Sequence, residues 1–158
     1  MRLKAFLRNT IGIYTFEDYR IVGIKLIKAK GLRRAFLKIK QRKIGYKRGI
    51  EIENWANIGE NFILAHPHGV IVNQEAKIGN NVKLYQNVTV GVVSTGKRKG
   101  APNICDGVTV YPGAVIVGGI TVGENATIAP NSFVNFDVPA GSLVIGNPGE
   151  IVQNKVTR

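Results

Sequence analysis

The chain has 158 residues and a formal net charge of +12, and 44% of its residues are hydrophobic. Its single cysteine, Cys105, excludes an internal disulfide, and no apolar run approaches the ~18 residues that a membrane-spanning helix needs. Because the first residues also lack the apolar stretch and cleavage site of a secretory signal, we expect a cytoplasmic protein.

The first 48 residues carry most of the positive charge. They contain 15 Lys and Arg against two acidic residues, whereas residues 49–158 contain seven basic and eight acidic ones. We therefore expect a basic helical N-terminal segment over residues 1–48 and a separate domain over residues 49–158. This asymmetry is typical of a protein with an anionic partner. No nucleic-acid-binding motif accompanies it, so we expect no nucleic acid among the partners.

Residues 16–43 mix aliphatic with basic side chains, and Gly31 separates two predicted helices. The second helix has an apolar face, surrounded by Lys and Arg, that consists of Leu32, Phe36 and Ile39. Two interpretations remain open. Either the segment makes peripheral contact with an anionic membrane, or it caps the end of the following domain and leaves its charges in water.

Residues 52–145 repeat with a period of six. The first residue of nearly every unit is Ile, Leu or Val, the fifth is small or β-branched, and the second is often Gly. A helix would need a period of 3.6 and an amphipathic strand a period of 2. The pattern instead predicts short strands joined by tight corners, with three units to each coil of a parallel β-helix. The expected fold is therefore mainly β.

Two interruptions break this period. Val70 and Ile71 are interpreted as extra residues that directly follow the stretch HPHG, which holds the only two histidines of the chain. Residues 93–103, VSTGKRKGAPN, predict a protruding surface loop. Long loops without repeats are more often functional than incidental, so we expect the loop to take part in function.

The stretch LAHPHGVIVNQEAKIGNNVKLYQNVTVG at 64–91 and the closing IGNPGEIV at 145–152 carry a resemblance to a known family. They resemble the hexapeptide-repeat acyltransferases with a left-handed parallel β-helix, and among these the serine O-acetyltransferase branch. The resemblance covers roughly the last two-thirds of the chain. It implies a hexapeptide-repeat solenoid that uses acetyl-CoA as co-substrate, needs no metal, and forms a homotrimer with active sites between subunits.

The resemblance also bears on the acceptor. The HPxG form resembles branch members that acetylate sugars in capsular and exopolysaccharide pathways. Where serine acetyltransferases have an Asp, an Arg and a second essential His, this chain has Ala65, Gly100 and Ala101. We therefore expect an O-acetyltransferase that acts on a hydroxyl of a saccharide acceptor in polysaccharide biosynthesis. The alternative is a serine O-acetyltransferase of cysteine biosynthesis.

Transfer of an acyl group from a thioester to a hydroxyl requires a base that removes the hydroxyl proton. By resemblance His66 matches the catalytic histidine of the family, so we assign it this role. Glu51 matches the acidic residue that orients that histidine and stabilises the imidazolium. Glu53 is the nearby rival for the same role.

Other residues are candidates for binding. By resemblance the small residues that line the pantetheine arm are Gly91, Gly113, Ala114 and Ala129, although each is also an ordinary repeat residue. The candidates for the phosphates of the cofactor, or for an anionic acceptor, are Lys97, Arg98 and Lys99. His68 either contacts the acceptor or fills a corner of the coil. Trp55 either stacks on a sugar or packs at a subunit contact.

Two further functional classes compete with this interpretation. A zinc enzyme of the γ-carbonic-anhydrase type would need three histidines, and this chain has two within one hexapeptide, so we expect no metal. A non-catalytic β-helix scaffold, or a protein that only binds an anionic surface, is compatible with the repeat. It leaves HPHG and the loop at 93–103 without a purpose.

Overall fold

The structure of the chain, a computed structural model, describes residues 16–152. The chain divides into two compact units, residues 1–47 and 48–158.

The first unit contains two helices, α2 (Phe16–Lys28) and α3 (Gly31–Tyr46). Gly31 lies at the break between them and has a φ of +53°, a left-handed conformation that glycine adopts at little cost. The two predicted helices and the break at Gly31 are therefore confirmed.

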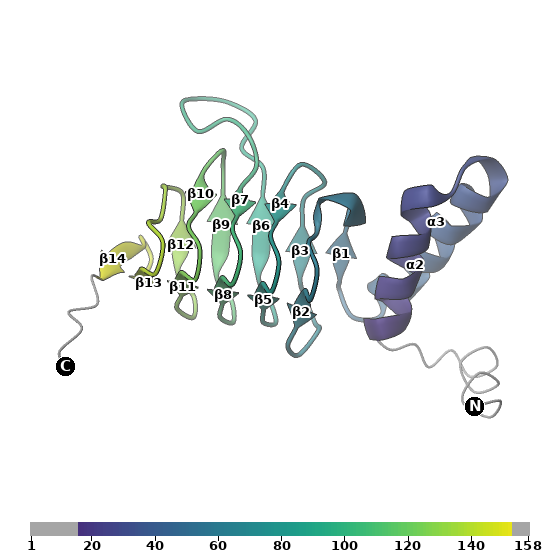
Figure 1. Cartoon of the computed structure of the whole chain (residues 1–158), viewed down its shortest axis with the longest axis horizontal. Helices are drawn as coiled ribbons and strands as arrows, with labels where there is room; N and C mark the ends of the chain where they lie inside the picture. Colours follow the sequence, from purple (N-terminus) through teal and green to yellow (C-terminus); the bar gives the residue numbers. More distant parts are fainter. Residues whose placement is uncertain (1–15, 153–158) are drawn as a thin grey trace. The chain divides into compact units, whose positions relative to one another are not determined.

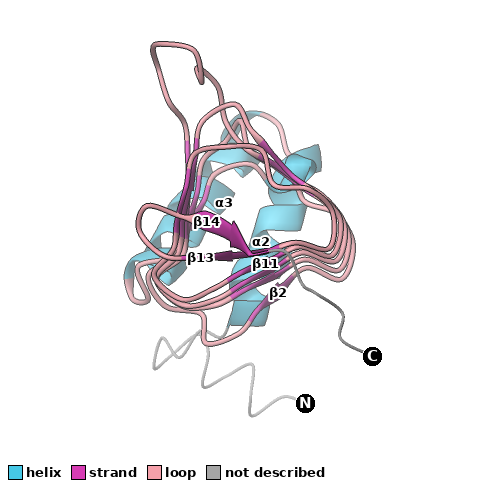
Figure 2. Ribbon diagram, turned by 90° about the vertical axis from the view of Figure 1, so that its left-hand side faces the viewer, coloured by secondary structure: helices cyan, strands magenta, loops and turns pink. Residues whose placement is uncertain are grey.

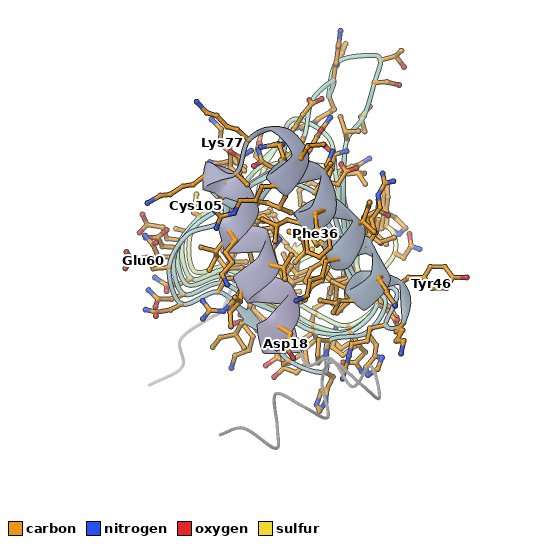
Figure 3. All side chains as sticks on the ribbon, turned by 90° about the vertical axis from the view of Figure 1, so that its right-hand side faces the viewer. Asp18, Phe36, Tyr46, Glu60, Lys77 and Cys105 are labelled. Atoms are coloured by element: carbon orange, nitrogen blue, oxygen red, sulfur yellow. The ribbon has the colours of Figure 1, made fainter. Side chains whose placement is uncertain are left out.

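The two helices bury only part of their apolar residues. Tyr19 and Val22 of α2 are buried, whereas Leu32, Phe36 and Ile39 of α3 are 91%, 68% and 68% exposed. Tyr46, at the end of α3, also points away from the helices (Figure 3). Among residues 16–152, no helix is both long and apolar enough to cross a membrane.

The second unit is a coil of short strands in three sheets (Figure 1). Sheet A consists of β1 (Glu51–Ile52), β3 (Ile71–Val72), β6 (Thr89–Gly91), β9 (Val115–Val117) and β12 (Phe133–Val134). Sheet B consists of β4 (Lys77–Ile78), β7 (Asn103–Ile104) and β10 (Thr121–Val122). Sheet C consists of β2 (Ile63–Leu64), β5 (Lys83–Leu84), β8 (Thr109–Val110), β11 (Thr127–Ile128), β13 (Leu143–Ile145) and β14 (Glu150–Val152).

The chain passes from sheet C to sheet A to sheet B in each coil, and neighbouring coils pair in parallel. Only β14 at the C-terminal end of the described coil turns back, and it pairs antiparallel with β13. Viewed along its axis, the coil is a triangle (Figure 2). The fold is the mainly β, left-handed parallel β-helix that the repeat and the resemblance predicted.

The core of the coil follows the six-residue pattern. First-position residues such as Leu84, Ile104 and Ile116 come from the three different sheets and are completely buried. Fifth-position residues such as Val88 and Val108 are also completely buried at the corners. Each large aliphatic side chain contributes about 1.5–3 kcal/mol when it leaves water. Stacked coils thus bury a continuous column that one coil could not bury alone.

The corner between sheets C and A alternates Gly and Asn. Asn87 and Asn131 have φ values of +58° and +57°, in the left-handed region that Asn tolerates better than most residues. A Cβ added to Gly69 would collide with the Oδ1 atom of Asn87, and one added to Gly113 would collide with that of Asn131. Backbone conformation and space therefore both require glycine at these two positions.

The loop at 93–103 leaves the coil after β6 and returns at β7, so it projects from the corner between sheets A and B (Figure 2). A backbone bridge between Val93 and Gly100 closes its base. The side chains of Lys97, Arg98 and Lys99 are exposed along it.

Candidate active site at the histidine bulge

The two histidines lie on a bulge at the corner between sheets C and A. Residues 65–70 connect β2 to β3, whereas the four residues 85–88 make the same connection in the next coil. Ala65 donates its N–H to Leu84 at 2.9 Å, and Asn87 donates to the carbonyl of His68 at 2.9 Å. The single residue Gln86 therefore faces all three residues of the His-Pro-His stretch.

The extra residues are thus within His66–His68, and our assignment of the insertion to Val70 and Ile71 is wrong. Val70 is completely buried and Ile71 pairs in register with Thr89 of the next coil. Both belong to the regular repeat. The physical consequence is that the insertion pushes the histidines outward and leaves the following strand in place.

The backbone of the bulge is unusual at His66. Its φ is +58°, and every other non-glycine residue with a positive φ in residues 16–152 is an asparagine. The N–H of His68 donates to the carbonyl of His66 at 2.8 Å and closes a tight turn around Pro67. Both imidazoles are exposed. His68 therefore does not fill a corner of the coil, and His66 is open to a substrate.

Two tyrosines lie next to His66, and sequence reasoning missed them. The ring centroids of His66 and Tyr85 are 6.3 Å apart, with the ring planes tilted by 45°. Tyr85 in turn stacks on Tyr111, with 5.0 Å between centroids and 14° between planes. Both residues occupy the second position of their repeat unit, where glycine is frequent. An alignment of whole coils, rather than of hexapeptides, would have shown them at the same corner.

Gln86 follows Tyr85 and faces the bulge from the next coil. Its carbonyl accepts a hydrogen bond from Gly113 N at 3.1 Å, which ties the corner to the next coil. Its side-chain oxygen Oε1 is buried, and no donor among the described residues bonds to it. A buried acceptor of this kind costs free energy. The packing of the core gives no reason for a glutamine at this corner.

Glu51 starts β1, opposite Ile71, and its carboxylate is exposed. The hydrogen bonds and ion pairs of the described residues do not include one between Glu51 and His66. The rival Glu53 accepts a hydrogen bond from Gln74 N at 3.1 Å and so has a structural role. That Glu51 orients His66 stays a prediction.

The four small residues predicted to line the cofactor differ in their surroundings. Ala114 is wrong as a cofactor contact, since its side chain is fully buried and its N–H and C=O bond to Tyr111 and Thr89. Gly113 is required by the corner itself, because its φ is positive and an added Cβ would collide with Asn131. Gly91 ends β6 opposite Val117, and Ala129 is partly exposed beside Tyr111 on the outer surface. Gly91, Gly113 and Ala129 are partly exposed and stay predictions, and only Ala114 is excluded.

The loop cations are not equivalent. Arg98 pairs with Asp137 at 3.1 Å, and the same carboxylate accepts a hydrogen bond from Thr121 N at 2.8 Å. The pKa of Asp137 is lowered, first by the Thr121 bond and then by Arg98, against an opposing effect of desolvation. Arg98 therefore anchors the loop, while Lys97 and Lys99 extend into water and suit the phosphates better.

Trp55 does not offer a ring face to a sugar. It belongs to the turn η1 (Trp55–Asn57), is only 6% exposed, and meets Phe62 edge to face at 6.4 Å. The sugar-stacking interpretation of Trp55 is therefore wrong. For Cys105, burial raises the pKa of the thiol, with further contributions from Glu124 and Asp106, which argues against a reactive thiolate. Within residues 16–152 no three His, Cys, Asp or Glu side chains gather as a metal site.

Part of the coil matches a known family of transferases. Residues 101–135, from the end of the loop through β12, match the family model described as bacterial transferase hexapeptide, six repeats. This stretch of the coil therefore carries the repeat that the family model describes. The chain is also 45% identical over 106 residues to a serine acetyltransferase of Bacillus subtilis, a match that covers 66% of this chain and 48% of that protein.

Two solved serine acetyltransferases resemble this chain in structure. The soybean enzyme complexed with serine has a TM-score of 0.72 and 32% identity, over 85% of this chain and 54% of its own. Another serine acetyltransferase, complexed with CoA, has a TM-score of 0.71 and 30% identity. The match covers 85% of this chain and 54% of that protein. The chain thus spans about half the length of these relatives. Their names do not support the predicted closeness to capsular and exopolysaccharide enzymes.

Proposed function

We propose that the chain transfers an acetyl group from acetyl-CoA to a hydroxyl, with His66 as general base. The exposed His66 on its bulge carries this proposal. The hydroxyl oxygen attacks the thioester carbonyl carbon while His66 takes the hydroxyl proton. The tetrahedral intermediate then collapses, the ester forms, and the proton passes to the departing thiolate of CoA. Neither a metal nor an enzyme nucleophile is needed for this direct transfer.

The cofactor and one acceptor are supported by the comparisons. A relative that was solved with CoA supports acetyl-CoA as the donor. Serine as the acceptor is supported by a relative that was solved with serine and by the names of the curated relatives. Serine is therefore the first acceptor to test. A role in polysaccharide biosynthesis has no support from the comparisons, and a saccharide acceptor is favoured by a single structural observation, the aromatic pair beside His66.

We also propose that the site is completed between copies of the chain in a trimer. His66 lies at the corner between sheets C and A, whereas the loop with Lys97 and Lys99 leaves the corner between sheets A and B. These corners lie at opposite ends of the strands of sheet A. A loop that serves as part of an active site therefore serves the histidine of a neighbouring copy.

The test is release of CoA thiol from acetyl-CoA with serine as acceptor, for the wild type and for His66→Asn. Asparagine tolerates the left-handed backbone of residue 66, so this variant keeps the bulge and removes the base. We expect turnover to fall by about 10²–10⁴-fold, the usual contribution of a general base.

Lys77→Ala is the control, since Lys77 extends from β4 of sheet B into solvent (Figure 3) and lies outside the proposed site. It should retain wild-type turnover. If His66→Asn also retains wild-type turnover, then His66 is not the base and the proposed mechanism is wrong.

A further inference from the structure

We infer that Tyr85 and Tyr111 form an aromatic shelf that holds the ring of a saccharide acceptor beside His66. The inference rests on the proposed acetyl transfer and concerns the class of acceptor. It assigns a specificity-determining role to two residues that the catalytic chemistry itself does not use.

The shelf follows from the periodicity of the coil. Tyr85 donates its N–H to Val110 at 3.0 Å, and Tyr111 donates to Ile128 at 2.9 Å, so the two residues occupy the same place in successive coils. Strands of a sheet repeat every ~4.8 Å, which is also a good spacing for stacked rings. The observed 5.0 Å between centroids and 14° between planes match that spacing. Stacking therefore fixes the orientation of both rings.

The residues on both sides of the pair are small. The column at this corner reads Ala65, Tyr85, Tyr111 and Ala129 in successive coils. Tyr111 covers one face of the Tyr85 ring. On the other side the column offers only the methyl group of Ala65, and His66 stands there at a tilt of 45° rather than stacked. This leaves the face of Tyr85 beside the proposed base without a packed partner ring.

That arrangement suits a saccharide better than a small amino acid. A pyranose ring presents an apolar face of C–H groups, which packs on an aromatic ring, and a rim of hydroxyls, one of which then lies toward His66. Ligand sites typically combine an aromatic wall with a few polar groups in this way. Serine has no ring to place on Tyr85. Ala65, which precedes His66, has a side chain that offers serine neither a charge nor a hydrogen bond.

The experiment compares Tyr85→Leu and Tyr85→Phe with the wild type in two assays. The first is saturation-transfer NMR with methyl β-galactoside, methyl α-glucoside and serine as separate probes. The second is acetyl transfer to each probe, with KM measured for both the acceptor and acetyl-CoA. Ile145→Ala is the matched control, because Ile145 follows the same column, is 46% exposed and has no aromatic ring.

We expect at least one glycoside to bind and to be acetylated by the wild type. Tyr85→Leu should raise the glycoside KM by about tenfold, as the loss of an aromatic stacking contact does, and should leave the KM for acetyl-CoA unchanged. Tyr85→Phe, which keeps the ring, and Ile145→Ala should both retain the wild-type KM. Tyr111→Ala should weaken glycoside binding to a smaller degree, because it removes only the support of the Tyr85 ring.

Three results would overturn the inference. The first is no NMR signal and no turnover with any glycoside. The second is a rise in the KM for acetyl-CoA in Tyr85→Leu, which would assign the rings to the cofactor. The third is efficient acetylation of serine with a KM that does not depend on Tyr85. In this third case the acetyl transfer stands and only the acceptor class is wrong, whereas full turnover by His66→Asn would refute the proposed chemistry itself.

Discussion

The Asp137 carboxylate binds the side chain of Arg98 in the protruding loop. Asp137 lies in the segment after β12, yet it accepts hydrogen bonds from Thr121 N and from the Arg98 guanidinium. These bonds favour the ionised carboxylate and hold its pKa below the ordinary value of 3.8. Because the folded pKa is lowered, the contribution to stability is complete above the ordinary pKa and is lost as the pH falls through the lowered value. Acid should therefore release the Arg98 side chain from Asp137, whereas the ion pair should persist at neutral pH.

The order of the two causes can be tested by an NMR titration of the Asp137 carboxyl. The Thr121 bond lowers the pKa most, so Arg98→Gln should raise the midpoint but leave it below 3.8. Asp106 is the internal control, since its pKa is lowered by Asn80 N and by the Asn80 side chain at another corner. Its midpoint should not move. A midpoint for Asp137 at the ordinary value in Arg98→Gln would mean that the guanidinium is the main cause.

At the scale of the element, α3 has an apolar face that no described residue of its own unit covers. Leu32, Phe36 and Ile39 are spaced by four and three residues, so they share one side of the helix, and basic residues flank them. An apolar strip with cationic borders suits the interface of an anionic bilayer. The alternative, a cap on a solenoid end, would bury the same strip against protein.

Co-sedimentation with vesicles of phosphatidylcholine, with and without phosphatidylserine, separates these interpretations. A membrane contact predicts binding only to the anionic vesicles, with a steep fall as salt rises. The double variant Leu32→Ser, Phe36→Ser should bind the anionic vesicles about tenfold more weakly, because it removes two exposed apolar side chains that would enter the bilayer. Ile151→Ser, an exposed residue of β14, is the matched control and should bind like the wild type. Equal binding by the double variant would favour the cap.

At the scale of the whole molecule, the repeat predicts the coil well because one physical cause dominates it. Nearly every first and fifth position points to a common axis, so the same pattern recurs wherever a coil must close. The same rule explains the errors. Ala114 occupies a fifth position and is therefore buried, which excludes it from the cofactor. Val70, Ile71 and Val72 are all aliphatic, so the hexapeptide phase alone could not show that the extra residues lie in His-Pro-His.

The stacked tyrosines show what the short period hides. Their contact joins residues one coil apart, and the loop at 93–103 lies between them in the sequence. The six-residue spacing alone therefore does not show that Tyr85 and Tyr111 are in contact. The pairing of β5 with β8 shows it. In the same way, the ion pair of Arg98 with Asp137 joins the loop to a later coil and has no signal in the repeat.

The exposed surface next to the bulge bears on assembly. Ile63 and Ile71 lie on the strands that lead into and out of the His-Pro-His stretch, and they are 47% and 43% exposed. Isoleucines that border a polar site gain from coverage by another copy of the chain. A trimer that places a neighbouring loop over His66 would cover this same surface.

Sedimentation equilibrium gives the decisive measurement. A trimer of the 17.2 kDa chain should have a mass of about 52 kDa. Ile71→Asp should dissociate it, since a charge at a desolvated contact is costly, and turnover should fall together with the mass. Lys77 is the exposed first residue of strand β4, as Ile71 is of strand β3, and Lys77→Asp should remain a trimer with full turnover. A monomeric wild type that is fully active would mean that one chain holds the complete site. The loop at 93–103, at the far end of sheet A from His66, would then have no part in it.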